Sequence, residues 1–197
     1  MSLFRLAKIV EPEPLLRGDG LYLRPAVASD FPAWAQLRAE SRDFLTPWEP
    51  TWPDDDLTRA AFRRRLRRQN EEISRDESFS FLIFDSASNA LLGGLTLGGV
   101  KRGVAQAATL GYWMGQAHAG KGRMTRAVRV AARYGFATLR LHRIEAACLP
   151  QNIASMTLLE RNGFQREGLA RAYLRINGAW RDHVLYALLE PEAIRLG

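Results

Sequence analysis

The feature that most constrains this chain is a glycine-containing segment between a strand-like apolar run and a helix-like run. It covers residues 112–126 and reads Tyr-Trp-Met-Gly-Gln-Ala-His-Ala-Gly-Lys-Gly-Arg-Met-Thr-Arg. Gly120 and Gly122 allow the backbone to turn sharply, so that successive N–H groups become exposed. The helix expected from Arg123 adds the positive end of its dipole to these donors. Such a backbone-built site binds phosphate, and we predict that it holds a diphosphate.

Other phosphate-binding loops do not fit this segment. In a nucleotide-binding P-loop the Gly-Lys pair is followed by Ser or Thr, but Gly122 follows Lys121 here. The strand before the loop also lacks the glycine fingerprint of a dinucleotide-binding fold. The spacing therefore argues against both alternatives.

The remaining pattern predicts one mixed sheet with helices on both faces. Strand-like runs lie at 21–24, 79–84, 91–100, 107–114 and 143–149, and two final strands share a turn at Asn177 and Gly178. Helical spacing or capping residues predict helices after Asp30 and at 59–68, 123–139 and 153–161. No linker or repeat divides the sequence, so we expect a single domain over 1–197 of the α/β (α+β) class, with its core at about 20–190.

The composition favours a cytoplasmic protein. The 197 residues are 47% hydrophobic and contain no long uncharged apolar run, so no membrane partner is expected. The first residues lack the layout of a signal peptide. Cys148 is the single cysteine, which excludes an intrachain disulfide, and it is expected in the core. The three histidines have no metal-ligand spacing, so no metal is expected.

The chain is basic, with 28 Lys and Arg against 21 Asp and Glu, and much of the excess falls at 59–68. Phe62 and Leu66 are four residues apart in this run, which predicts an amphipathic helix with a solvated arginine face. The alternative is a footprint for phosphate-rich partners, either ribosomal RNA or the phosphates of a cofactor.

Before this helix, residues 44–53 hold two tryptophans and three prolines, too many prolines for regular structure. Such a loop either shapes a pocket or plugs the core. The acidic run 54–56 is expected to open the arginine helix.

The diphosphate loop resembles the acyl-CoA pyrophosphate loop of the GNAT superfamily of N-acetyltransferases. Further motifs at 110–114, 150–155, 158–164 and 177–183 resemble the Rim-type N-terminal acetyltransferases. The segment 44–50 looks closest to the RimJ branch, which acetylates an N-terminal alanine of a ribosomal protein. The resemblance implies a GNAT-type sheet, mixed and mostly antiparallel with about seven strands. It also implies an acyltransferase that uses acetyl-CoA to acetylate an amine, above all a protein N-terminal α-amine on Ala or Ser.

The resemblance also implies positions for the cofactor. Residues expected to hold the pyrophosphate through backbone N–H groups are Gly120, Lys121, Gly122, Arg123 and Met124. Residues expected to pair with the pantetheine arm are Trp113, Met114 and Gln116, with the Met114 N–H polarising the thioester carbonyl. The sequence departs from the superfamily pattern at Ala119 and Met124.

Asn152 and Ser155 match positions that contact the cofactor near its sulfur in relatives. Ser155 is the candidate general acid for the departing thiolate. Asn152 would equally serve as a helix N-cap, so both roles remain open. The short helix at 153–161 contains no tyrosine, so the tyrosine acid of many superfamily members has no counterpart in it.

The general base is the most open assignment. A terminal α-amine has a pKa of about 7.7–8, against about 10.4 for lysine, so a weak base or a water chain suffices. Glu49 and Glu145 are the favoured candidates. Weaker candidates are Glu40, Asp182, His118 and His183. Pro47, Trp48 and Glu49 in the aromatic loop are expected to contact the acceptor.

Two alternatives concern the activity itself. The acceptor could be a small-molecule amine, although a net charge of +7 disfavours polyamines. The chain could also be a non-catalytic ribosome- or RNA-binding protein with a GNAT fold. Its support lies in the arginine run and in the departures at Ala119 and Met124.

Overall fold

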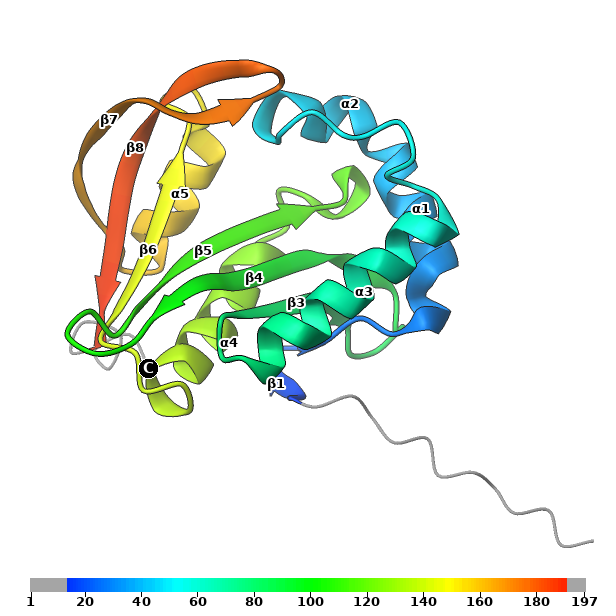
Figure 1. The fold of residues 1–197 in the computed structure, drawn as a ribbon, viewed down its shortest axis with the longest axis horizontal. Coiled ribbons are helices and arrows are strands. Elements are labelled where there is room, and N and C mark those ends of the chain that lie inside the picture. Colours follow the sequence, from blue (N-terminus) through cyan, green and yellow to red (C-terminus); the bar gives the residue numbers. More distant parts are fainter. Residues whose placement is uncertain (1–13, 191–197) are drawn as a thin grey trace, which may run out of the picture.

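Short apolar runs form the strands, and the computed structural model, which describes residues 14–190, joins them in one sheet. The strands are β1 (Leu16–Gly18), β2 (Leu21–Arg24), β3 (Ser78–Asp85), β4 (Leu91–Lys101), β5 (Ala107–Met114), β6 (Arg143–Cys148), β7 (Gln165–Ile176) and β8 (Ala179–Leu189). Their order is β1-β2-β3-β4-β5-β6-β8-β7, and every neighbouring pair is antiparallel except β5 and β6. The predicted mixed, mostly antiparallel sheet is confirmed (Figure 1).

The sheet has eight strands in place of about seven, because the short β1 pairs with β2. The turn between them contains Asp19 and Gly20, whose φ angles are 54° and 75°. Positive φ at both central residues is what a two-residue hairpin turn requires. An Asp-Gly pair is a hairpin signal, so β1 could have been predicted from the sequence.

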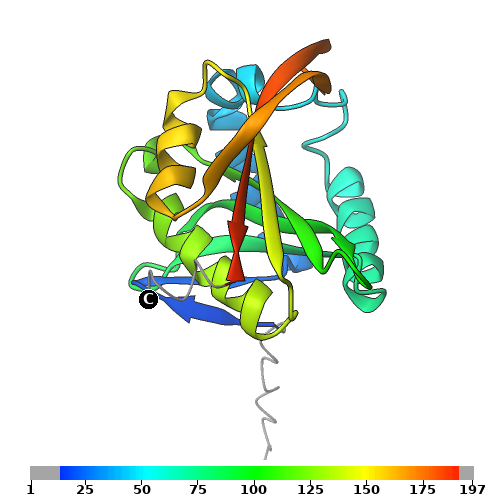
Figure 2. The ribbon, with the colours of Figure 1, turned by 90° about the vertical axis from the view of Figure 1, so that its left-hand side faces the viewer.

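Helices cover both faces of the sheet (Figures 1 and 2). They are α1 (Phe31–Glu40), α2 (Arg42–Leu45), α3 (Arg59–Ser74), α4 (Arg123–Ala137) and α5 (Ile153–Arg161), with short 3-10 helices at η1 (Ala28–Asp30), η2 (Thr46–Trp48) and η3 (Gln116–His118). The larger core lies between the sheet, α4 and α5, and it includes Cys148 as expected. A smaller core around Trp34 and Phe62 lies under α1 and α3.

The segment before α3 differs from the prediction. Residues 44–53 are not wholly irregular, because η2 accommodates Pro47 in its first turn, where no backbone donor is needed. The acidic run does not open α3. Thr58 is the N-cap, and its hydroxyl accepts from the Ala61 N–H at 3.2 Å. The buried Asp56 instead accepts from Arg65 of α3 at 2.7 Å.

Asp30 precedes α1 as expected but does not cap it through its side chain. Its carboxylate instead accepts two hydrogen bonds from Arg24 and one from the Val27 N–H, each at 2.7 Å. Between residues 14 and 190, no helix combines the length and apolar character needed to span a membrane.

Candidate active site

The two parallel strands of the sheet separate soon after they begin to pair. The register of β5 with β6 runs from Ala107 opposite Arg143 to Thr109 opposite Glu145. Beyond this point the two strands diverge, as Figure 1 shows. The second half of β5 therefore exposes one backbone edge to the opening between the strands.

The Met114 N–H points into this opening. At the end of β5 the Gly115 N–H donates to the Leu92 carbonyl of β4 at 2.9 Å. Successive strand residues direct their N–H groups to opposite edges, so that of Met114 faces away from β4. A backbone donor is thus available where the resemblance expects one.

The two other backbone positions predicted for the pantetheine arm are used within the protein. Trp113 is in register with Gly94 of β4 and by the same alternation faces that strand. The Gln116 N–H donates to Ser41 Oγ at 2.9 Å, and the Gln116 carbonyl accepts from the Ala119 N–H at 3.2 Å.

The glycine loop has the geometry of an anion site. Gly120 and Gly122 have φ angles of 72° and 68°, in the left-handed region that favours glycine. Gly122 is also the N-cap of α4, so no side chain caps the helix, and the first turn contains no acidic residue. The first N–H groups of α4 therefore remain open to a ligand. Met124, one of the two departures, packs its side chain into the core and leaves this helix start undisturbed.

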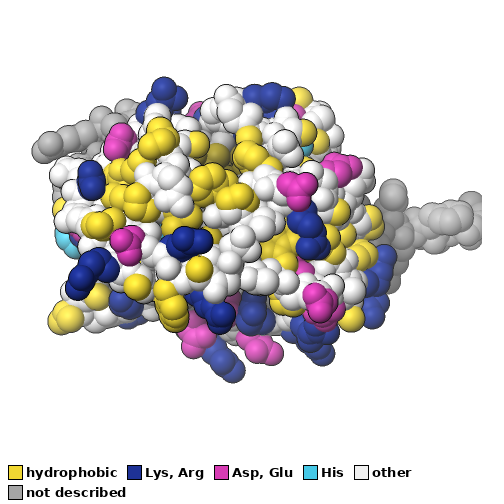
Figure 3. Space-filling model, turned by 90° about the horizontal axis from the view of Figure 1, so that it is seen from above, with side chains coloured by type: hydrophobic (Ala, Val, Ile, Leu, Met, Phe, Trp, Pro, Cys, Tyr) yellow, Lys and Arg dark blue, Asp and Glu magenta, His cyan; other side chains and the backbone are white. Residues whose placement is uncertain are grey.

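An apolar cleft of about 480 Å³ connects this loop with the opening beside β5. Predicted site residues that line it are Trp48, Glu49, Trp113, Met114, Gly120, Gly122, Arg123, Met124, Asn152 and Ser155. Lys121 is exposed and donates to the Ala117 carbonyl at 2.9 Å, and neither it nor Pro47 lines the cleft. Partly exposed apolar side chains, including Phe44 and Ile153, also line the cleft. Seen from above, this end of the molecule displays many hydrophobic side chains (Figure 3).

Ser155 has a partner that the sequence did not predict. The hydroxyl of Tyr112, on the diverging part of β5, lies near Ser155 of α5, and both residues line the cleft. Burial raises the pKa of Tyr112 to about 12, while the nearby Ser155 hydroxyl acts in the opposite direction. A tyrosine thus stands beside the candidate acid although α5 has none. Nearby, Asn152 caps α5 by accepting from the Ser155 N–H at 3.0 Å, and its contact with a cofactor stays a prediction.

Glu49 lines the cleft, and its carboxylate already accepts three hydrogen bonds. Arg38 donates to both of its carboxylate oxygens at 2.7 Å, and Trp52 Nε1 donates to one of them at 2.7 Å. The Arg38 guanidinium in turn lies 4.0 Å and 4.8 Å from the ring centroids of Trp52 and Trp113.

Glu145 lies outside the cleft. Its strand diverges from β5 only after Glu145 itself, which still pairs opposite Thr109. Its carboxylate accepts from Arg143 Nε at 2.8 Å. The expectation that this strand carries Glu145 into the site therefore has no support in the geometry.

The weaker candidates for the general base lie in different parts of the structure, and only one of them lines the cleft. Glu40 accepts from Gln36 at 2.9 Å on the exposed side of α1, and Asp182 accepts from the Ala172 N–H at 2.8 Å in the last hairpin. His183 is buried and lines neither large cavity. His118 does line the cleft, and its Nδ1 lies 2.9 Å from an Arg123 amino group. Burial first, and then the charges of Arg123 and Lys121, lower the pKa of His118.

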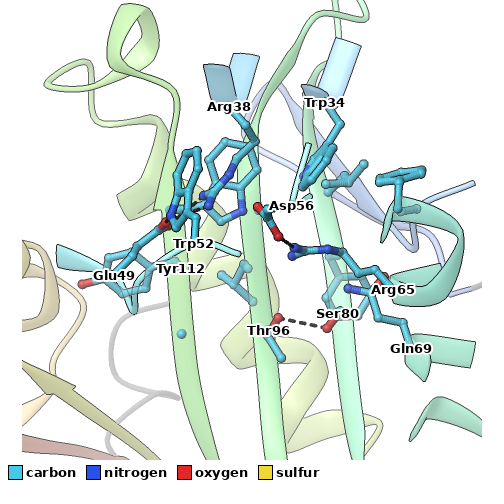
Figure 4. A pocket seen from close by; sticks show the side chains of 18 of the residues that line it. Trp34, Arg38, Glu49, Trp52, Asp56, Arg65, Gln69, Ser80, Thr96 and Tyr112 are labelled. Carbon is cyan, nitrogen blue, oxygen red and sulfur yellow. Dashed lines mark hydrogen bonds and ion pairs between the residues drawn. The ribbon is translucent and has the colours of Figure 1, made fainter. Parts of the chain in front are cut away.

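A second cavity, of about 630 Å³, lies on the face of the sheet covered by α1 and α3 (Figure 4). It shares Glu49, Tyr112 and Trp113 with the cleft. The two cavities are therefore adjacent beside the open edge of β5. Sequence patterns show neither cavity, because both depend on where distant elements meet.

Comparisons with known proteins show what this chain is similar to. A family model for the acetyltransferase (GNAT) domain matches residues 20–165. The ribosomal protein uS5-alanine N-acetyltransferase of Escherichia coli is 40% identical over 183 residues, which cover 92% of this chain and 93% of that protein.

Two solved structures share the fold over most of the chain. A ribosomal-protein-S5-alanine acetyltransferase from Vibrio fischeri has a TM-score of 0.82 at 32% identity, covering 89% of this chain and 96% of that one. RimJ of Mycobacterium smegmatis, in complex with CoA-disulfide, has a TM-score of 0.85 at 32% identity, covering 92% and 91%.

The described residues fit coenzyme A as a ligand. Open N–H groups at the start of α4 suit its diphosphate. The apolar cleft suits the arm between diphosphate and thioester, and the Met114 N–H lies at the far end. The chain therefore belongs to the acetyltransferase (GNAT) family, and it is an N-acetyltransferase that takes its acetyl group from acetyl-CoA.

Proposed function

We propose that this enzyme acetylates the N-terminal α-amine of a protein, with a ribosomal protein beginning in Ala or Ser as the favoured acceptor. The observation that carries the proposal is the second cavity, of about 630 Å³, which adjoins the cofactor cleft at Glu49, Tyr112 and Trp113. Pockets of about 300–1,000 Å³ hold ligands of several hundred daltons, so the first residues of a peptide fit. The names of the relatives support the choice of a ribosomal protein.

Backbone groups hold the donor in this proposal. When bound, acetyl-CoA supplies an acetyl group activated as a thioester. The N–H groups at Gly120, Gly122 and the first turn of α4 hold the diphosphate. The Met114 N–H donates to the carbonyl oxygen, and this bond strengthens as negative charge develops there.

Tyr112 and Ser155 form the acid side of the site. We assign Ser155 to protonate the departing sulfur, with the neighbouring Tyr112 hydroxyl replacing the proton. The raised pKa of Tyr112, about 12, keeps its hydroxyl protonated at the pH of the cell. The pair therefore remains ready to deliver a proton over a wide pH range.

Glu49 is the carboxylate that we place beside the acceptor amine. A carboxylate has about four lone-pair sites, and Arg38 and Trp52 occupy three of those of Glu49. The fourth can accept a proton directly or through a water. A strong base is not needed, because an α-amine with a pKa of about 7.7–8 is already partly neutral near pH 7.

Mass spectrometry of the acceptor tests this proposal. Peptides beginning in Ala, Ser or Lys are incubated with enzyme and acetyl-CoA, beside small amines at equal concentration. We expect the Ala and Ser peptides to gain one acetyl group at the α-amine. Acetylation of the small amines with every peptide unchanged would refute it.

Contact with ribosomal RNA stays a prediction. Arg63 and Arg67 on the outer side of α3 are exposed and available for it. Filter binding of ribosomal RNA to the enzyme and to an Arg63→Gln/Arg67→Gln variant measures whether they contribute.

A further inference from the structure

The arginine run of α3 has two faces with different surroundings. Arg65, Arg68 and Gln69 are spaced i, i+3 and i+4, which places them on one side of the helix. All three line the second cavity, whereas Arg64 and Arg67 do not. Figure 4 shows Arg65 and Gln69 at one side of this cavity and Glu49 and Tyr112 at the other. The predicted solvated face therefore accounts for only part of the run.

The cavity-facing side chains have hydrogen-bond donors to spare. The Arg65 guanidinium, which carries five N–H groups, makes one hydrogen bond within the described part of the chain, to Asp56 at 2.7 Å. Arg68 has one ion pair among these residues, with Glu72 at 3.5 Å. The Gln69 side chain makes no hydrogen bond to another residue of 14–190. Together they can donate several hydrogen bonds to a bound group.

Positive charge is in excess on the walls of this cavity. Three guanidinium groups line it, those of Arg38, Arg65 and Arg68, against two carboxylates, Glu49 and Asp56. Arg38 and Arg65 already pair with those two carboxylates, and the partner of Arg68, Glu72, does not line the cavity. Arg38 is 6% exposed, and its Nε has no hydrogen-bond partner within residues 14–190. Burial first lowers the pKa of Arg65, and repulsion from Arg38 and Arg68 lowers it further.

The distance across the sheet from Tyr112 to α3 indicates which residue of a bound peptide would meet this positive charge. Tyr112 is on β5, and the cavity floor crosses β4 at Thr96 to reach β3 at Ser80, under α3. Two strand spacings span about 10 Å, which equals about three residues of extended chain. A peptide with its amine beside Tyr112 thus brings its third or fourth residue to Arg65 and Arg68.

We infer that Arg65, Arg68 and Gln69 form a subsite for an acidic side chain near the third or fourth residue of the acceptor peptide. The inference rests on the proposed function and narrows its substrate class to acceptors with an early Asp or Glu. Guanidinium and carboxamide donors match a carboxylate, which accepts two parallel hydrogen bonds. A basic side chain at the same place meets the excess positive charge and is rejected.

Matched peptides test the subsite. Each begins with Ala, is otherwise neutral, and carries Glu, Gln or Lys at one position from the second to the fifth. The kcat/KM of acetyl transfer is measured for each peptide with the wild-type enzyme. We expect Glu at the third or fourth position to exceed Gln by about tenfold, the ratio that one charge-assisted hydrogen bond supports.

Two variants of α3 locate the effect. Arg68→Gln removes one cation from an exposed side chain, and we expect it to reduce the preference for Glu to about twofold. Gln69→Glu introduces a negative charge at the same place, and we expect it to favour Lys over Glu. Arg67→Gln is the control, because Arg67 points to the outside of the same helix and should keep the full preference.

The outcomes separate this inference from the proposed function. Equal kcat/KM for Glu and Gln peptides at every position overturns the subsite while peptide acetylation stands. A preference that survives in both Arg68→Gln and Gln69→Glu also overturns it. No acetylation of any peptide overturns the proposed function and the subsite together.

Discussion

At the scale of single residues, the proposed chemistry depends most on Tyr112 and Ser155, which lie near each other in the cleft. Tyr112 lies on β5 where that strand leaves β6, and Ser155 lies in the first turn of α5. Both side chains therefore line the cleft beside the opening into which the Met114 N–H points. The proton donor and the carbonyl-polarising donor that we propose thus lie around one point.

Removal of the Tyr112 hydroxyl should slow the reaction without weakening donor binding. For Tyr112→Phe we expect kcat to fall by about a hundredfold, the lower end for loss of a general acid. The KM for acetyl-CoA should stay within about twofold, because in our placement backbone groups bind the diphosphate. Steady-state kinetics measure both. Tyr134→Phe, which removes a hydroxyl outside both cavities, is the control.

The pH dependence should reflect the same pair. Burial raises the pKa of Tyr112 from its ordinary value of 10 to about 12, so the protonated donor persists through pH 10. In the wild type, kcat/KM for the peptide should rise until about pH 8, as the amine loses its proton, and then stay level. A decline between pH 8 and pH 10 would show that another acid governs the step.

Glu49 combines a structural contact with a proposed chemical one, and paired substitutions separate them. Glu49→Leu leaves the buried Arg38 without its carboxylate, which should cost about 3 kcal/mol and lower the melting temperature by roughly 10 °C. Adding Arg38→Met should restore most of this stability, since an apolar pair replaces an ion pair.

The kcat of the double variant shows whether Glu49 accepts a proton or only stabilises the structure. If Glu49 accepts the proton, Arg38→Met/Glu49→Leu stays slow even though its melting temperature recovers. Recovery of kcat together with stability would mean that Glu49 only positions the loop. Calorimetry and initial rates on the same preparations give both values.

At the scale of elements, the glycine loop depends on its backbone conformation. Gly122 has a φ of 68°, where a side chain costs about 1–2 kcal/mol. A Cβ there would meet no protein atom within 4 Å, so a larger side chain would project into the space assigned to phosphate. For Gly122→Val we therefore expect the Kd for acetyl-CoA, measured by titration calorimetry, to rise at least tenfold.

Two controls accompany this change. Gly103→Val places the same side chain at a φ of 65°, in the β4–β5 turn outside the cleft, and should leave the Kd unchanged. Arg64→Ala should also leave it unchanged, since its ion pair with Asp55 is exposed. Similar losses of affinity in all three variants would contradict our placement of the diphosphate.

Elements governed by local pattern were predictable, and contacts between elements were not. The strand runs, the loop glycines and the Asn177-Gly178 turn follow from residues within a few positions of one another. The divergence of β5 from β6, the Tyr112 contact with Ser155 and the cavity-facing side of α3 arise when distant segments meet. Periodicity places Arg65 on a helix but does not say what covers it.

At the scale of the whole molecule, two cavities adjoin beside the open edge of β5, where both are lined by Glu49, Tyr112 and Trp113. The cofactor cleft opens between β5 and α5, and the second cavity lies under α1 and α3. In the proposed function each ligand has its own binding surface, so neither needs to leave before the other enters. Such an arrangement favours direct attack by the amine, because both reactants are held in place together.

Direct transfer makes a kinetic prediction that a covalent route does not share. Cys148 is buried, and burial raises its pKa to about 11, so it remains a thiol that is poorly suited to accept an acetyl group. Double-reciprocal plots at several peptide concentrations should therefore intersect. The intact mass of the enzyme should stay unchanged after incubation with acetyl-CoA alone. Parallel lines together with an acetylated enzyme would instead establish a two-step transfer, in which the adjoining cavities are used in turn.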